Sequence, residues 1–124
     1  MKQGDIATFE DGEVIYQKGD LVDYIYILVD GVVDFEATAT SGHNLDFVLE
    51  EGDYFGEIST ILMPGEDALV RFDTATARGA VRCQVIPVDE FRAQMRAMPV
   101  MIQSLMQNTY SKALRAIICS QERS

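Results

Sequence analysis

Short apolar runs separated by glycine turns, in the first two-thirds of the chain, constrain the fold most. Many short strands with closely spaced turns are typical of an all-β sandwich or barrel. We therefore predict a β domain, with a hairpin turn at Asp30-Gly31 and another turn at Arg78-Gly79. The expected strand segments are 13–19, 24–31, 32–40, 45–50, 69–77 and 80–88.

The last third of the chain follows a helical pattern. Residues 89–98 open with acidic side chains, which suit the N-terminal end of a helix, and Pro99 is compatible with the first turn of a second helix. Apolar residues, several of them methionines, then recur at helical spacing as far as position 118. This wide stripe is explained equally well by packing against the β domain and by a homodimer interface through residues 99–120.

Composition excludes several classes of function. The chain has 124 residues, 48% of them hydrophobic, so we predict one domain over 1–124. A net charge of −10 argues against nucleic-acid binding, which needs clustered Lys and Arg. The sequence contains no run of 18 apolar residues, so we predict no membrane span, and the N-terminus is unlike a secretory signal. We expect a cytoplasmic protein with reduced thiols.

Catalytic and metal-binding motifs are missing from the sequence. There is no G-x-S-x-G, P-loop or H-E-x-x-H, and the single histidine, His43, falls in a turn-like segment. Cys83 and Cys119 fit no metal spacing. We therefore expect no enzymatic activity, no catalytic residues, no metal and no cofactor.

The stretch 54–58 is unusual for a turn, because an aromatic pair leads into Gly56 and then into Glu57, which has apolar neighbours. A glycine at such a place predicts positive φ or a close approach of the backbone to another atom. The carboxylate that follows either caps a helix start or accepts hydroxyl groups from a ligand.

The order of these segments resembles the cyclic nucleotide-binding domain family, from about residue 8 to 118. The similar pieces are 10–20, 24–33 and 50–58, with Phe91 after the last strand. The resemblance implies an eight-stranded type of β jelly roll over about 8–88 and C-terminal helices over about 89–120. The glycines that fall at the family's turn positions are Gly19, Gly31, Gly52 and Gly56.

The family's chemistry implies a role for the glycine-glutamate turn. In the family, backbone N–H groups at a short helix start face the cyclic phosphate. A carboxylate matching Glu57 accepts the ribose 2′-hydroxyl, and an arginine neutralises the phosphate. The resemblance therefore implies a site for cAMP or cGMP made by Phe55, Gly56, Glu57, Ile58, Ser59, Arg71 and Phe72.

The arginine segment departs from the family pattern. Matching residues 74–78 to the family strand puts Asp73 at the arginine's place, whereas counting back without gaps from Phe91 puts Arg71 there. We prefer the second register, in which Phe72 and Asp73 replace two small residues. Two alternatives remain open at this point: Arg71 as a surface residue paired with an acid (Asp73 or Glu66), and Glu57 as a helix cap.

Two functions follow. The first is a non-enzymatic regulatory module that senses cAMP or cGMP and relays the signal through helix 99–120 to a protein partner, without a DNA-binding segment. The alternative is a degenerate member of the family that binds no nucleotide and acts as a protein-interaction and dimerisation scaffold. Whether Arg71 or Asp73 faces the phosphate site separates the two.

Overall fold

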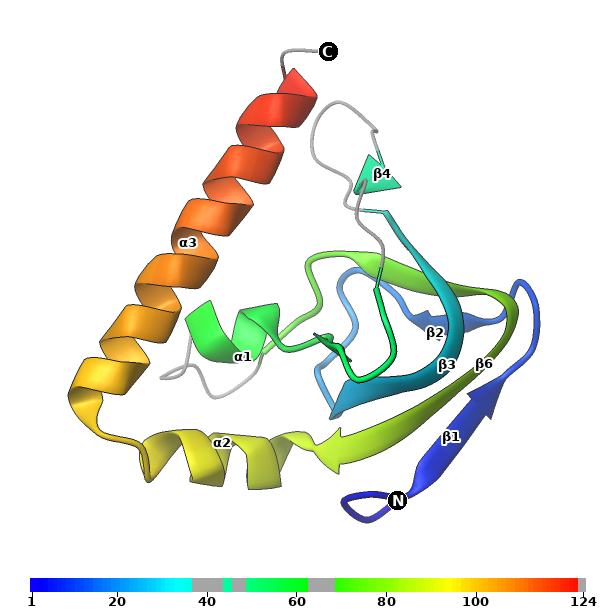
Figure 1. Ribbon diagram of the computed structural model, residues 1–124, viewed down its shortest axis with the longest axis horizontal. Coiled ribbons are helices and arrows are strands. Elements are labelled where there is room, and N and C mark those ends of the chain that lie inside the picture. Colours follow the sequence, from blue (N-terminus) through cyan, green and yellow to red (C-terminus); the bar gives the residue numbers. More distant parts are fainter. Residues whose placement is uncertain (37–43, 46–48, 63–68, 123–124) are drawn as a thin grey trace.

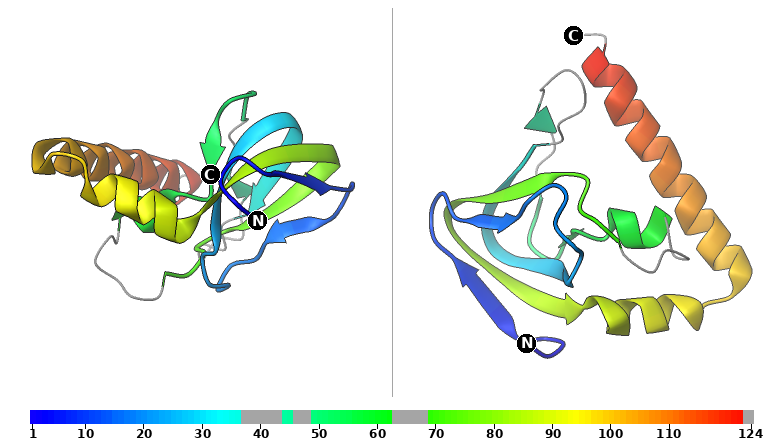
Figure 2. Two further views of the ribbon diagram at one scale, coloured as in Figure 1. Left: turned by 90° about the horizontal axis from the view of Figure 1, so that it is seen from below. Right: turned by 180° about the vertical axis from the view of Figure 1, so that it is seen from behind.

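The computed structural model describes residues 1–36, 44–45, 49–62 and 69–122, with backbone alone at 44–45 and 114–122. A mostly β region is followed by two helices that form an elbow on one side of the strands (Figures 1 and 2). The strands are β1 (Ile6–Phe9), β2 (Val14–Tyr16), β3 (Tyr24–Glu36), β4 (Asn44–Leu45), β5 (Tyr54–Phe55) and β6 (Thr74–Pro87). The helices are α1 (Ile58–Leu62), α2 (Val88–Arg96) and α3 (Val100–Glu122).

Two long antiparallel strands, β3 and β6, form the centre of the sheet, and they curve together in Figure 1. The short strands β1 and β2 pair with β6, while β4 and β5 pair with β3. Because β3 and β6 are strongly curved, the short strands along their length come to enclose a common interior. The predicted order, strands first and helices last, is confirmed.

The two predicted turns at Asp30-Gly31 and Arg78-Gly79 are wrong. Both β3 and β6 continue through these glycines, and the register shifts only locally, between Leu28 and Val32. Gly31 has φ 106° and Gly79 has φ 73°, so each bends its strand instead of reversing it. Glycine supplies the positive φ that a bulge or a sharp bend needs, as well as the positive φ of a hairpin.

The core contains a stack of aromatic rings beneath the curved strands. Tyr26 stacks on Phe55 with ring centroids 5.2 Å apart and on Tyr16 at 6.2 Å. A second buried cluster lies on the opposite face of the same strands, since Ile25 and Ile86 alternate with Tyr26 and Val85, and Phe91 of α2 packs there. Both β5, which pairs with Tyr26 and Ile27, and α2, which follows Pro87, are therefore attached at the end where β3 begins and β6 ends.

The C-terminal helices occur where the sequence predicts them. Helix α1 lies between α3 and the strands (Figures 1 and 2) and contacts α3. The start of α3 is exposed, with Met101 at 80% and Leu105 at 60% of their full accessibility. The dimer interface proposed for 99–120 stays a prediction. Within the described residues, no helix is both long enough and apolar enough to cross a bilayer.

Some predictions fall outside the described residues. The strand at 45–50 is described only at its ends, and His43 and Glu66 are not described. The thiol of Cys83 is free and fully buried in the β core, whereas the side chain of Cys119 is outside the described set.

The bend at Gly31 leads to a prediction about stability. A Cβ atom there would lie 2.5 Å from the carbonyl oxygen of Ala80 and 2.8 Å from Cα of Val81. We expect Gly31→Ala to lower the free energy of unfolding by about 3–4 kcal/mol, because backbone strain and a backbone clash add together. Gly79→Ala is the matched control, since φ is also positive but nothing lies within 4 Å of the added atom.

We expect the control to cost about 1–2 kcal/mol, from positive φ alone. Urea denaturation of both variants measures the difference. Equal losses in the two proteins would show that the close approach at Gly31 contributes nothing.

Candidate functional site

All of the predicted binding residues line one cavity of about 80 Å³, at the junction of β5, α1 and the segment before β6. The cavity is also bordered by aromatic residues and one acid that the prediction did not include in the site. The predicted residues are Phe55, Gly56, Glu57, Ile58, Ser59, Arg71 and Phe72, and the additional ones are Tyr16, Phe35, Tyr54 and Asp73.

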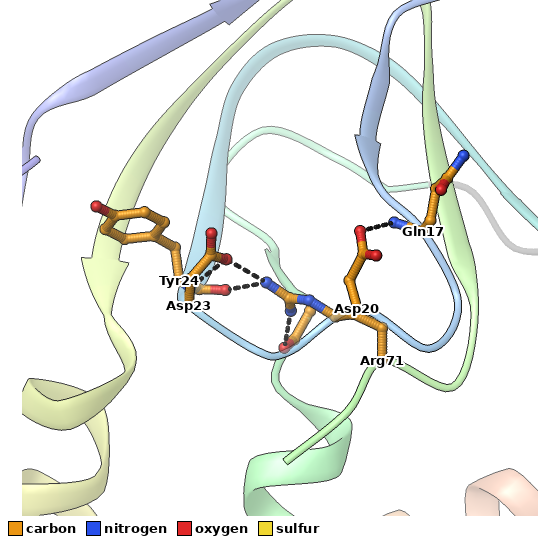
Figure 3. Close-up of polar contacts among 6 residues, drawn as sticks. Gln17, Asp20, Asp23, Tyr24 and Arg71 are labelled. Atoms are coloured by element: carbon orange, nitrogen blue, oxygen red, sulfur yellow. Dashed lines mark hydrogen bonds and ion pairs between the residues drawn. The ribbon is translucent and has the colours of Figure 1, made fainter. Parts of the chain in front are cut away.

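Arg71 is held in place by the loop between β2 and β3. Its backbone N–H donates to the carbonyl of Asp20, and its own carbonyl accepts from the N–H of Gly19, both at 2.8 Å. The loop is closed on itself, since the Asp20 carboxylate accepts from the N–H of Gln17 at 3.1 Å (Figure 3). These backbone hydrogen bonds therefore fix the position of the Arg71 main chain independently of its side-chain contacts.

The guanidinium of Arg71 turns into the interior and is only 3% exposed. Nη2 donates to the Tyr24 carbonyl at 2.6 Å and to Asp23 Oδ1 at 3.2 Å (Figure 3). Nη1 donates to the carbonyl of Gly56 at 2.8 Å, and Cζ lies 4.1 Å from the ring centroid of Tyr16, a cation–π geometry. The alternative of a surface arginine is therefore wrong, because the residue is buried and its ion-pair partner is Asp23.

The contact with Arg71 explains why position 56 is glycine. Gly56 has φ 80°, as the sequence predicted, and a Cβ there would lie 2.8 Å from Nη1 of Arg71. A larger residue would push the guanidinium away from the Gly56 carbonyl. A second hydrogen bond joins α1 to the segment before β6, because the Ser59 hydroxyl donates to the carbonyl of Val70 at 2.8 Å.

The carboxyl group of Glu57 is 8% exposed and faces α3 as well as the cavity. Oε1 accepts from the hydroxyl of Tyr110 at 3.2 Å, while Oε2 has no hydrogen-bond partner in the described part of the chain. Burial raises the pKa of Glu57, and the Tyr110 hydroxyl and the charge of Arg71 act in the opposite direction. Sequence reasoning placed Tyr110 only in the apolar stripe, because no local signal links it to a residue so distant in the sequence.

Asp73 faces the same cavity as Arg71, so both alternatives of the sequence question hold together. Both residues are buried and line this cavity, with Phe72 half-buried between them, and the chain bends at 72–73 before β6 begins at Thr74. The hydroxyl of Tyr16 donates to Asp73. Burial raises the pKa of the Asp73 carboxyl to about 6, although the Tyr16 hydrogen bond and the charge of Arg71 oppose it.

A larger cavity, of about 600 Å³, lies between α1, α2 and α3 and shares Tyr54 and Glu57 with the first. Its walls are mainly apolar and include three methionines, of which Met106 belongs to the C-terminal stripe. The remaining lining residues are Leu49, Asp53, Ile61, Phe91, Gln94, Met95, Met98, Met106 and Tyr110. The stripe therefore faces a cavity as well as the core.

Residues 6–98 match the family model described as the cyclic nucleotide-binding domain, and the chain belongs to that family. It is 33% identical to the cAMP-dependent protein kinase regulatory subunit of Dictyostelium discoideum, over 87% of this chain and 32% of the relative. It is 27% identical to the global nitrogen regulator of Synechococcus elongatus, over 89% of this chain and 49% of the relative. The chain thus spans 32% of the length of the first relative and 49% of the second.

Solved structures share the fold. The EAL enzyme Bd1971 bound to cAMP and cyclic-di-GMP gives a TM-score of 0.75 at 20% identity, over 94% of this chain and 30% of that one. The catabolite activator protein of Thermus thermophilus gives 0.60 at 21% identity, over 97% and 52%. The predicted fold class, a β jelly roll followed by helices, is confirmed. The family is a regulatory binding domain, and the enzyme is matched through less than a third of its length.

The buried acid at position 73 makes the stability of the domain depend on pH. A carboxyl pKa of about 6 in the folded state lies above the ordinary value of 3.8, so ionisation destabilises the fold. The stability that the domain has with a neutral Asp73 is fully present below pH 3.8 and is lost as pH rises through about 6. Asp73→Asn, which keeps an acceptor for Tyr16 but cannot ionise, removes this loss.

We expect Asp73→Asn to be more stable than the native protein at pH 8 by about 2–3 kcal/mol, and the difference to shrink towards pH 5. Chemical denaturation at pH 5, 6, 7 and 8 measures it. Glu90→Gln removes one charge from an exposed site on α2 and serves as the control. A stability difference between the two variants that stays constant with pH would contradict the buried titration.

Proposed function

We propose that the domain binds a cyclic nucleotide, cAMP or cGMP, with its cyclic phosphate at Arg71 and its ribose 2′-hydroxyl at Glu57. The observation that carries the proposal is a pair of buried polar atoms on one cavity. Within the described residues, Nε of Arg71 and Oε2 of Glu57 have no hydrogen-bond partner. Buried donors and acceptors without partners are costly, and a ribose cyclic phosphate offers an acceptor for the first and a donor for the second.

The turn before α1 would complete the phosphate contacts. The first N–H groups of a helix lack partners within the helix, so those of Ile58 and Ser59 are available to phosphate oxygens. Phe55 and Phe72 border the same cavity and would contact the sugar. Each residue of the predicted site therefore has a role in this proposal.

The two cavities together accommodate the size of the ligand. The first, at about 80 Å³, is smaller than the 300–1,000 Å³ range typical of small-molecule sites, whereas the second, at about 600 Å³, is within it. We place the phosphate and ribose in the first and direct the base into the second. There Tyr54 and Tyr110 offer aromatic rings near the shared wall. Helix α3 would then contribute to the choice of base.

The hydrogen bond between Glu57 and Tyr110 gives a route from the ligand to α3. A ribose hydroxyl that binds Glu57 competes with the Tyr110 hydroxyl for the same carboxylate, so the ligand alters how α3 is held. We propose that α3 passes this change to a protein partner. The exposed apolar residues at its start, such as Met101 and Leu105, are suited to an interface, and a second copy of the chain is one such partner.

Asp73 favours the second candidate function, a scaffold that binds no nucleotide. An ionised carboxylate beside the phosphate position repels an anion. Under that alternative the cavity stays without nucleotide, and the domain acts through protein contacts alone. The experiments below distinguish the two by direct binding.

Thermal melts with cAMP and cGMP test the proposal at pH 5.5, where Asp73 is largely neutral. A ligand at about 100 times its dissociation constant stabilises the native state by about 2.7 kcal/mol, which raises the midpoint by about 10 °C for a domain of this size. We expect Arg71→Ala to remove the shift and Arg78→Ala to retain it, because Arg78 lies on the surface with Asp34.

No shift with either nucleotide, in folded protein shown to be free of bound ligand, would favour the scaffold. A shift that survives in Arg71→Ala would place the nucleotide elsewhere.

The role of Glu57 is tested with 2′-deoxy-cAMP. A hydrogen bond to a buried carboxylate contributes about 1.5–3 kcal/mol, so we expect the native domain to bind the deoxy analogue about 10- to 100-fold more weakly than cAMP. In Glu57→Ala the two ligands should bind with similar affinity. Isothermal calorimetry of both proteins with both ligands forms a double-mutant cycle, and an unchanged preference in the variant would exclude Glu57 as the acceptor.

A further inference from the structure

We propose that the nucleotide binds with a proton on the carboxyl group of Asp73, so that the domain takes up this proton where the group is ionised and its affinity falls as pH rises. The inference rests on the proposed function and adds a regulatory property to the same site. It depends on one cluster, Arg71, Asp73 and Tyr16, and on the charges that face it.

In this cluster, Asp73 and Arg71 lie against the same cavity. Both side chains line one cavity from the segment just before β6, and Asp73 is only 4% exposed. Tyr16 contacts both residues, because its ring face lies under the guanidinium and its hydroxyl donates to the Asp73 carboxylate. A phosphate that reaches Arg71 therefore also comes close to Asp73.

The charges around Asp73 leave little attraction for an anion. Tyr16 faces it from β2, Glu57 from the turn before α1, and Arg71 from its own segment. Arg71 already binds the carboxylate of Asp23 at 3.2 Å. If both buried acids are ionised, their two negative charges outnumber the one guanidinium before any phosphate arrives.

Protonation changes Asp73 from a group that repels the phosphate into one that can donate a hydrogen bond to it. An ionised carboxylate only accepts hydrogen bonds, whereas the neutral acid has one O–H donor and still accepts through its other oxygen. It can keep the hydrogen bond from Tyr16 and donate to a phosphate oxygen. The proton comes from solvent, no covalent bond changes, and the bound complex carries one proton more than the free domain with ionised Asp73.

Asp73 is better suited to hold this proton than Glu57. Glu57 accepts from Tyr110 through Oε1, and in the proposed complex it accepts from the ribose through Oε2, so both oxygens act as acceptors. Burial already brings the pKa of Asp73 to about 6 in the free domain. A phosphate nearby raises it further, because a like charge disfavours ionisation. Above that value, binding requires a proton that the free domain does not hold.

Calorimetric titration of the native domain with cAMP and with cGMP between pH 5.5 and 8, in two buffers of different ionisation enthalpy, tests this directly. Above pH 6 we expect the dissociation constant to rise about tenfold per pH unit, and the buffers to report close to one proton taken up at pH 8. Asp73→Asn should bind at pH 8 about as tightly as the native domain at pH 5.5, with no proton uptake from this position.

Glu90→Gln, which makes the same charge change on the surface of α2, should follow the native pH profile. Asp73→Ala is a second variant in case the Asn variant folds poorly, and it should also lose the pH dependence.

Each other outcome has a definite meaning. Native binding that is equal at pH 5.5 and 8, without proton uptake, overturns the inference and leaves the proposed function intact. A pH dependence and proton uptake that persist unchanged in Asp73→Asn assign the proton to another group and also overturn it. If neither the native domain at pH 5.5 nor folded Asp73→Asn binds either nucleotide, the proposed function fails and the inference fails with it.

Discussion

The buried guanidinium of Arg71 is the interaction on which the site depends. It connects three segments that are distant in the sequence: the turn at Gly56, the start of β3 at Asp23 and Tyr24, and its own segment before β6. A guanidinium in the interior requires acceptors on several sides, and backbone carbonyls supply two of them. The short strand β5 and the helix α1 are therefore positioned by a charge as well as by apolar packing.

The positive charge of Arg71 also explains how the site accommodates two buried carboxyl groups. Glu57 and Asp73 are both buried, and each has Arg71 as the cation that favours its ionised form. Burial acts against ionisation at both positions and is the larger effect. In the proposed mode, the protonation state of Asp73 would therefore decide whether the site attracts an anion.

Sequence reasoning selected residues that line one cavity, but it did not give the complete lining of that cavity. The residues around Gly56 and Arg71 were predictable because a glycine before a carboxylate and an arginine before a strand are local patterns with a known family arrangement. Tyr110 and Asp23 were missed because they reach the site through tertiary packing, 53 and 48 positions from their partners. The choice between Arg71 and Asp73 could not be made from the sequence, because the chain bends at 72–73 and it is the tertiary fold that brings both residues to one cavity. The hairpins were mispredicted because positive φ at glycine suits a bend as well as a turn.

Because Tyr110 of α3 donates a hydrogen bond to Glu57, the position of α3 would also affect the affinity for the proposed ligand. Coupling between two binding events is reciprocal: the factor by which one ligand changes the affinity for a second equals the factor by which the second changes the affinity for the first. Any molecule that holds α3 in the position where Tyr110 occupies Glu57 would weaken nucleotide binding, and one that draws α3 away would strengthen it. In the proposed mode, the concentration of nucleotide to which the domain responds is therefore a property of the domain together with whatever is bound to its last helix.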